Sequence, residues 1–289
     1  MRLLLLVGDQ PAQRALAHRL ATVADVVAIV VSANVARRPP RPLARARQVA
    51  RSLSARVLAR PLREAWASLQ SGYACEYPGW PDTDLSRVRN VNDLETFASV
   101  EHHAPDLVAV SGTNLVGRRL LGLPSVSQGF LNLHTGISPY VRGGPNCTNW
   151  CLSKGWLHLI GNTVMWLDPG IDSGPLVATE RTSLAGTESL AELHRKVMDH
   201  AFDLYARAIE RAARGLSLSR VDQRTIAEGR VFYNAEWGLK EMRRAIRNHT
   251  LLLRPHVFTT EPFLSATREV RLVPLPDGVD VSSVAPPRA

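Results

Sequence analysis

The segment LLLLVGDQPAQRALAHRLATVADVVAIVV, residues 3–31, decides the fold class. It opens with a short apolar run, continues with alanines and leucines at helical spacing over 11–21, and ends with a β-branched run over 26–31. A strand, a helix and a second strand within about 30 residues are typical of the start of a parallel sheet covered by helices. We therefore expect an α/β fold.

Further apolar patterns extend this arrangement along the chain. Strands are expected over 106–112, 129–134 and 162–167, and helices over 93–101 and 187–214. After Gly215 we expect a short strand over 230–233, a helix over 236–248 and an irregular tail from Pro274. The chain is thus expected to consist of an α/β domain over 1–215 and a small C-terminal extension over 216–289.

The overall composition is that of an ordinary globular protein, with 45% hydrophobic and 21% charged residues. The first apolar run is too short for a signal peptide, and no run reaches the roughly 20 residues that a membrane helix needs. We therefore expect a cytoplasmic location and no membrane partner. Cys75, Cys147 and Cys151 are expected to be reduced structural thiols, and His158 near the last two does not complete a metal site.

The positive charge is concentrated in one segment. Residues 37–64 contain nine arginines and one glutamate, which gives +8 of the chain's net +9. Apolar residues at helical spacing in this segment indicate a basic helical insertion over about 37–70. A solvated helix face is the favoured interpretation, and a phosphate-binding helix stays open.

The turn after the first strand excludes two common nucleotide-binding classes. It reads Gly8-Asp9-Gln10-Pro11 and offers one glycine, whereas dinucleotide and Walker-type sites need several. We expect Asp9 to cap the following helix with its carboxylate, which disfavours a phosphate at that position. A nicotinamide-dependent dehydrogenase and a Walker-type nucleotidase are therefore poor interpretations.

The polar residues with the strongest chemical meaning follow the strand over 129–134. In an extended segment Asn132 and His134 project to the same side, at the edge where open α/β sheets bind ligands. A later loop, 168–174, offers a carboxylate. An amide, an imidazole and a carboxylate suit acyl transfer to an amine, because the first two can stabilise an oxyanion and the third can handle a proton. The alternative is that the asparagine and histidine are satisfied structural groups and that Asp168-Pro169-Gly170 is a simple turn.

The run Asn132-Leu133-His134, followed by Ser138-Pro139-Tyr140-Val141-Arg142-Gly143 and Gly170-Ile171-Asp172-Ser173-Gly174, resembles the folate-dependent formyltransferase family. The resemblance implies a Rossmann-like domain that binds N10-formyltetrahydrofolate as co-substrate, with Asn132, His134 and Asp172 as the catalytic set. It also implies cofactor contacts from two loops, which are Thr113, Asn114, Leu115 and Val116 in one and Asp168, Pro169, Gly170 and Ile171 in the other.

The same resemblance implies an N-formyltransferase that acts on the primary amine of a small molecule, such as an amino-sugar nucleotide or a biosynthetic intermediate. Three alternatives stay open: a methionyl-tRNA formyltransferase-like enzyme, a formyltetrahydrofolate hydrolase, and a non-catalytic protein that binds RNA or another anion. The arginines of 37–63 favour tRNA as a partner, but the residues after 215 lack the regularly spaced strands of an oligonucleotide-binding barrel. A homodimer is compatible with the sequence.

Overall fold

The central sheet confirms the expected α/β class. The structure is a computed structural model that describes residues 1–35 and 59–276, and within them seven strands form one sheet in the order β3-β2-β1-β4-β5-β7-β8. The neighbours from β3 to β5 are parallel, whereas β7 is antiparallel to both β5 and β8. The strands are β1 (Arg2–Gly8), β2 (Asp25–Ser32), β3 (Asp84–Val88), β4 (Leu107–Ser111), β5 (Gly129–His134), β7 (Gly161–Trp166) and β8 (Leu176–Arg181).

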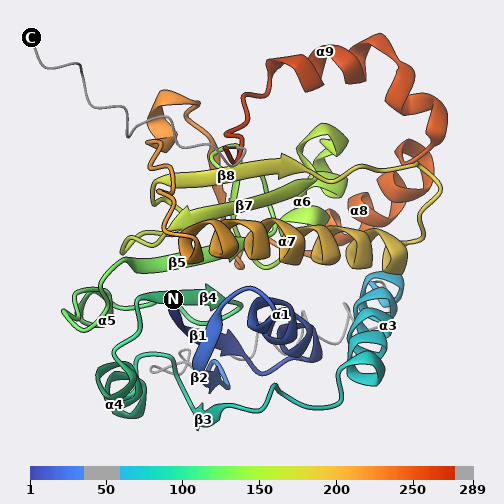
Figure 1. Cartoon of the computed structure of the whole chain (residues 1–289). Coiled ribbons are helices and arrows are strands. Elements are labelled where there is room, and N and C mark those ends of the chain that lie inside the picture. Colours follow the sequence, from blue (N-terminus) through green and yellow to red (C-terminus); the bar gives the residue numbers. More distant parts are fainter. Residues whose placement is uncertain (36–58, 277–289) are drawn as a thin grey trace, which may run out of the picture.

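Helices cover both faces of this sheet (Figure 1). One face carries α1 (Pro11–Ala21), α3 (Arg60–Glu76) and α7 (Leu190–Ala213), and the other carries α4 (Leu94–His103) and α5 (Arg118–Leu121). Side chains of β1 alternate between the two resulting cores, as the pleat of a strand buried on both sides requires. None of the described helices is both long and apolar enough to cross a membrane.

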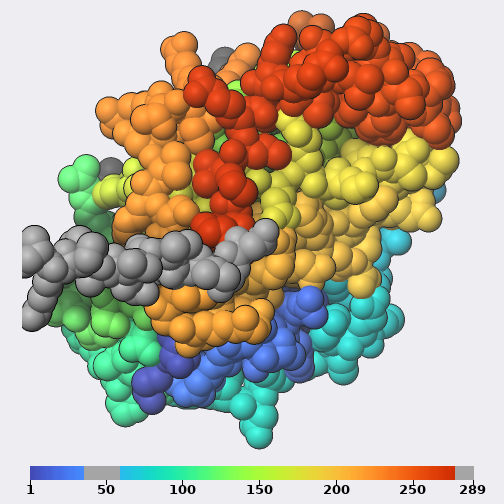
Figure 2. Space-filling model, turned by 45° about the horizontal axis from the view of Figure 1, so that its top comes forward, coloured from blue at the N-terminus to red at the C-terminus, as the bar shows by residue number. Residues whose placement is uncertain are grey.

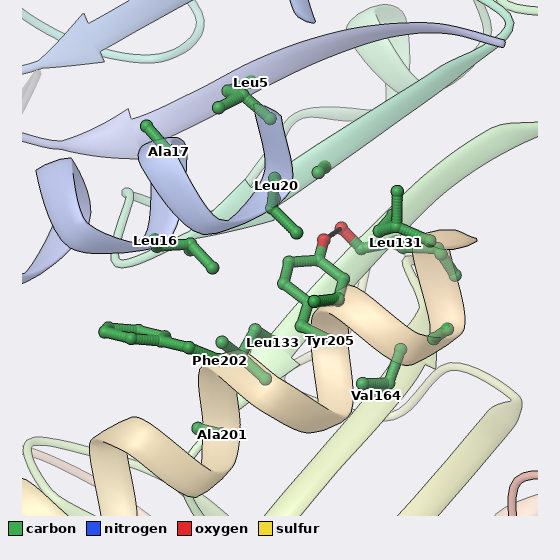
Figure 3. Packing of buried hydrophobic residues seen from close by; sticks show 14 of the residues in the cluster. Leu5, Leu16, Ala17, Leu20, Leu131, Leu133, Val164, Ala201, Phe202 and Tyr205 are labelled. Atoms are coloured by element: carbon green, nitrogen blue, oxygen red, sulfur yellow. Dashed lines mark hydrogen bonds between the residues drawn. The ribbon is translucent and has the colours of Figure 1, made fainter. Parts of the chain in front are cut away.

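Helix α7 is attached to the middle of the sheet through a buried tyrosine. Figure 3 shows Tyr205 packed against Leu131 and Leu133 of β5 and Val164 of β7. The Tyr205 hydroxyl accepts a hydrogen bond from the Val110 N–H at 3.0 Å and donates one to the Leu131 carbonyl at 2.8 Å. It therefore bridges the backbones of β4 and β5 close to their carboxyl ends.

The residues after 215 form a second core together with the middle of the chain. The short strands β6 (Val141–Gly143) and β9 (Arg230–Phe232) pair in parallel, and α8 (Leu239–Leu252) packs on α6 (Cys147–Lys154). Trp150 and Phe232 are both buried, with ring centroids 4.4 Å apart. In Figure 2 the orange and red C-terminal residues lie directly on the yellow ones that precede them. The C-terminal extension therefore packs on the sheet domain.

The expected elements are present with shifted ends, and several others were not anticipated. The helix expected over 236–248 is α8, which ends at Leu252. Part of the basic insertion expected over 37–70 is α3, while 36–58 and 277–289 lie outside the described residues. The unanticipated elements are β3, β6, β8, α5, α6, α9 (Glu261–Glu269), η1 (Leu157–Leu159), η2 (Gln223–Thr225) and η3 (Pro255–Thr259).

The expectation that Asp9 caps α1 is wrong. The N-cap residue is Gln10, which makes no side-chain capping bond. The Asp9 carboxylate accepts a hydrogen bond from Arg87 of β3 at 3.1 Å, so an ion pair replaces the cap. The Ala12 N–H at the helix start donates to the Gln70 side chain of α3 at 3.1 Å. A neutral carboxamide, rather than a carboxylate, therefore satisfies the first turn of α1.

Candidate active site

A cleft of about 400 Å³ lies at the carboxyl ends of the parallel strands. From β1 the chain proceeds to β2 and β3 on one side and later to β4 and β5 on the other, so the cleft occupies the switch point where α/β sheets bind ligands. Its walls are the turn after β1, the loop after β4, the end of β5, the loop before α6 and the loop after β7. The first two walls touch, since a Cβ on Gly8 would lie 2.5 Å from the Gly112 carbonyl oxygen.

The structure brings Asn132, His134 and Asp172 together in this cleft. One oxygen of the Asp172 carboxylate accepts a hydrogen bond from Asn132 Nδ2 at 3.2 Å. The other oxygen lies 3.3 Å from His134 Nδ1 and accepts a hydrogen bond from the Gly143 N–H at 2.9 Å. Two donors from β5 and one from β6 therefore surround a single carboxylate.

The local backbone explains how the carboxylate reaches these donors. The backbone of Asp172 has a φ of +46°, a left-handed conformation that aspartate tolerates better than most residues. In the same loop, the Asp168 carboxylate accepts hydrogen bonds from the Gly170 N–H at 3.0 Å and the Ser173 hydroxyl at 2.7 Å. Gly174 must be glycine, because a Cβ there would lie 1.8 Å from the Trp166 carbonyl oxygen. The loop's own side chains therefore contribute to its shape.

The electrostatics of this cluster favour a protonated imidazole. Burial on its own lowers the pKa of His134, but the Asp172 charge and hydrogen bonds with Cys147 and Val141 raise it to about 10. His134 Nε2 lies 3.0 Å from the Val141 carbonyl oxygen, to which it donates. At neutral pH both ring nitrogens therefore carry hydrogens, and the imidazolium is a donor on each side.

Cys147 is a neighbour of His134 that the sequence did not reveal. Its sulfur lies 3.5 Å from His134 Nε2 and 3.4 Å from the Gly143 carbonyl oxygen. Burial raises the pKa of the Cys147 thiol, which is therefore neutral at neutral pH. Among the described residues, no group of three or more histidine, cysteine or acidic side chains is placed to hold a metal ion.

The residues expected to contact the cofactor lie on two walls of the cleft, although not all of them face it. The Asn114 N–H donates a hydrogen bond to the Asn34 side chain at 2.9 Å. Pro169 and Ile171 belong to the loop after β7 but do not line the cleft. The expected residues that line it are Thr113, Asn114, Leu115, Val116, Asp168 and Gly170.

The remaining wall contains residues that sequence analysis missed. Trp66 of α3 and Met198 of α7 line the cleft beside Gln10 and Gln13. The ring of His194 meets Trp66 edge-on, with 5.8 Å between centroids. These side chains come from three helices that are distant in sequence, so no local pattern could have grouped them.

Comparisons with known proteins agree with this geometry. A sequence model described as "Formyl transferase" matches residues 1–209. A methionyl-tRNA formyltransferase of Clostridium perfringens is 28% identical over 124 residues, which is 43% of this chain and 39% of that protein. The chain thus matches about two fifths of the length of the curated relatives that it resembles.

Solved structures of low sequence identity share the fold. A sugar N-formyltransferase from a Shewanella species superposes with a TM-score of 0.54 at 15% identity, over 86% of this chain and 88% of that one. A phosphoribosylglycinamide formyltransferase from Anaplasma phagocytophilum gives 0.51 at 13% identity, over 81% of this chain and 98% of that one.

Proposed function

Because this chain belongs to the formyl transferase family, we propose that it transfers a formyl group from N10-formyltetrahydrofolate to the primary amine of a small molecule. The observation that supports this most directly is the convergence of Asn132, His134 and Asp172 in one cleft. The cluster supplies oxyanion donors and a proton acceptor. The amine of the acceptor then serves as the nucleophile.

The cleft suits a reduced folate as formyl donor. Its volume of about 400 Å³ lies within the range of small-molecule sites, roughly 300–1,000 Å³. Val110, Val116 and Leu167 offer apolar side chains to a flat bicyclic ring. Polar residues make up more of the lining, among them Asn114 and Asp168. A pterin has flat apolar faces and several hydrogen-bonding groups around its rim, so a lining of both kinds suits it.

Each residue of the cluster would have its own role in the reaction. As the amine attacks the formyl carbon, Asn132 Nδ2 donates a hydrogen bond to the oxygen that becomes negative. The His134 imidazolium, whose N–H groups face Asp172 and the Val141 carbonyl, stabilises that oxygen through its positive charge. Asp172 keeps His134 protonated and accepts the proton that the amine loses, directly or through water. Collapse of the intermediate breaks the bond to the folate N10, which takes up a proton. The products are a formamide and tetrahydrofolate.

The test is mass spectrometry of candidate amines incubated with the protein and a ¹³C-labelled formyl donor. We expect one amine to gain a single labelled formyl group. Asn132→Ala and Asp172→Ala should each lower turnover by about 10²–10³-fold, the loss typical of a missing oxyanion donor, whereas Asp203→Ala on the exposed side of α7 should not. Release of formate without a formamide would instead indicate a hydrolase, and no loss of the formyl group would contradict both.

A second candidate, a methionyl-tRNA formyltransferase, is favoured by the 28% identity to such enzymes. The nine arginines of 37–64 would suit a polyanion. Against it, the part of 216–289 that the structure describes forms η2, β9, α8, η3 and α9 rather than the strands of a barrel. Binding to tRNA that falls steeply with salt would support this candidate, and no binding at low salt would exclude it.

A further inference from the structure

Gln223 is a buried polar residue with contacts that the mechanism above does not use. It begins η2 in the C-terminal extension and is 4% exposed, while its neighbours Asp222 and Arg224 are exposed. It lies outside residues 1–209, which the formyl transferase model matches. A buried carboxamide between exposed neighbours calls for a specific partner.

Those partners belong to the loop that carries the carboxylate of the site. Gln223 Nε2 donates to the Asp172 carbonyl oxygen at 2.9 Å and to the Gly174 carbonyl oxygen at 2.8 Å. Each hydrogen of the carboxamide nitrogen thus serves one carbonyl. The opposite orientation of the amide would place its oxygen against both carbonyl oxygens, so the contacts fix the side chain in one direction.

The backbone on either side of Gln223 is also attached to this region. Val221 and Leu176 form an antiparallel bridge with N–O distances of 2.8 and 3.0 Å. Leu176 begins β8, two residues after Gly174. The C-terminal extension therefore fastens the chain immediately after the loop, and Gln223 fastens the loop itself.

We infer that Gln223 is a positioning residue, which holds the Asp172 carboxylate against Asn132, His134 and the Gly143 N–H by tying down the carbonyls of Asp172 and Gly174. This inference rests on the role proposed above for Asp172. Asp172 has a left-handed backbone, which persists only where the surroundings impose it. Without Gln223 the two carbonyls lose their donor, and the loop can relax toward an ordinary conformation.

The test compares Gln223→Met, which keeps the length and removes the donors, with Arg224→Gln in the same turn, where the native side chain is 93% exposed. Titration of the His134 ring, followed by NMR, reports how close the Asp172 carboxylate lies to the ring, because Asp172 is the main charge that raises the His134 pKa. Cys147 is the other titratable neighbour of the ring. In Gln223→Met we expect the His134 pKa to fall by about one unit. We expect kcat to fall about 10–100-fold, as is usual when a supporting hydrogen bond is removed, with KM for the folate changed far less. Arg224→Gln should change neither.

Unchanged His134 titration in a folded Gln223→Met protein would overturn the inference, even if activity fell, because a loss of stability alone would explain that fall. If Gln223→Met does not fold, Gln223→Asn keeps a shorter carboxamide and should shift the titration in the same direction by less. The NMR measurement needs no turnover, so failure of the proposed function would show as an inactive wild-type protein whose His134 still responds to residue 223.

Discussion

At the scale of single residues, the charge state of His134 is the property most open to measurement. We expect NMR to find a pKa of about 10 in the wild-type protein. Replacing Asp172→Asn removes the charge that opposes burial, so the pKa should fall below the ordinary 6.5. Because the positive charge of the protonated ring stabilises the oxyanion, formyl transfer by the wild type should decline as pH rises through 10. A titration near 6.5 in both proteins would contradict this account.

Some residues of the site can be predicted from the sequence, and others cannot. Strand alternation places Asn132 and His134 on one side, whereas Asp172 is singled out from the other acidic residue of its loop only by the resemblance to the formyltransferase family. Cys147 and the Gly143 N–H reach the same point only after the chain has turned through β6 into α6. Such contacts depend on tertiary packing, for which spacing in the sequence gives no signal.

At the scale of elements, the pairing of β6 with β9 connects the C-terminal extension to the cluster. Phe232 ends β9, is 1% exposed and stacks on Trp150. Replacing Phe232→Ala should lower the free energy of unfolding by about 3–5 kcal/mol, since it leaves a cavity in the second core. Tyr233→Ala at the next position, which is 55% exposed, serves as the control. Denaturant unfolding of the two variants measures the difference, and equal losses would contradict the assignment of Phe232 to the core.

The buried imidazole of His194 in α7 predicts sensitivity to acid. Burial, with a smaller effect of His249, lowers the pKa of His194 from 6.5 to about 4. The fold therefore favours the neutral ring, so this contribution to stability is complete above pH 6.5 and is lost as pH falls toward 4. The stability that is lost amounts to roughly 3 kcal/mol, because each unit of pKa shift corresponds to about 1.4 kcal/mol.

The variant His194→Phe keeps a ring against Trp66 and removes the titration. Its free energy of unfolding should therefore change less than that of the wild type between pH 6.5 and 4. Glu180 and Glu188 have pKa values lowered to about 2, so their contributions are lost below 4.5, in both proteins alike. Parallel pH curves for the variant and the wild type would refute the assignment.

Elements that the sequence did not predict, such as β3 and α6, lack the one-sided apolar pattern by which strands and helices are recognised. β3 lies at the sheet edge and is mostly exposed, so it lacks the apolar run that marks β1 and β4. α6 has eight residues and is buried on most of its surface, which removes the one-sided pattern of an amphipathic helix. α7, with a capping box at Ser189 and a long apolar stripe, is the opposite case and was found nearly in full.

At the scale of the whole molecule, the C-terminal extension is expected to be required for folding. Residues after 215 contribute Phe232, Ala245 and Leu253 to the core that also holds Trp150. A chain that ends at Gly215 should therefore expose this core and aggregate, as size-exclusion chromatography and circular dichroism would show. A monomeric product with an unchanged thermal midpoint would mean that the two parts fold independently.

The α/β class itself could be read from the first 31 residues, because a strand, helix and strand at that spacing admit few other arrangements. The order of the strands in the sheet could not be predicted from the sequence, since it depends on which strand edges pair. The antiparallel direction of β7 cannot be predicted for the same reason, although the sequence predicts a strand over 162–167. Strand β8, which pairs with it, is not predicted at all.

Helix α7 influences the shape of the cleft through the hydroxyl of Tyr205. This hydroxyl lies between the Val110 N–H and the Leu131 carbonyl, and so spaces β4 from β5 at the end of the sheet where the cleft opens. Tyr205→Phe removes this oxygen and should change the separation of the two strands, while every residue that lines the cleft stays the same. The width of the cleft is therefore adjustable from a helix on one face of the sheet.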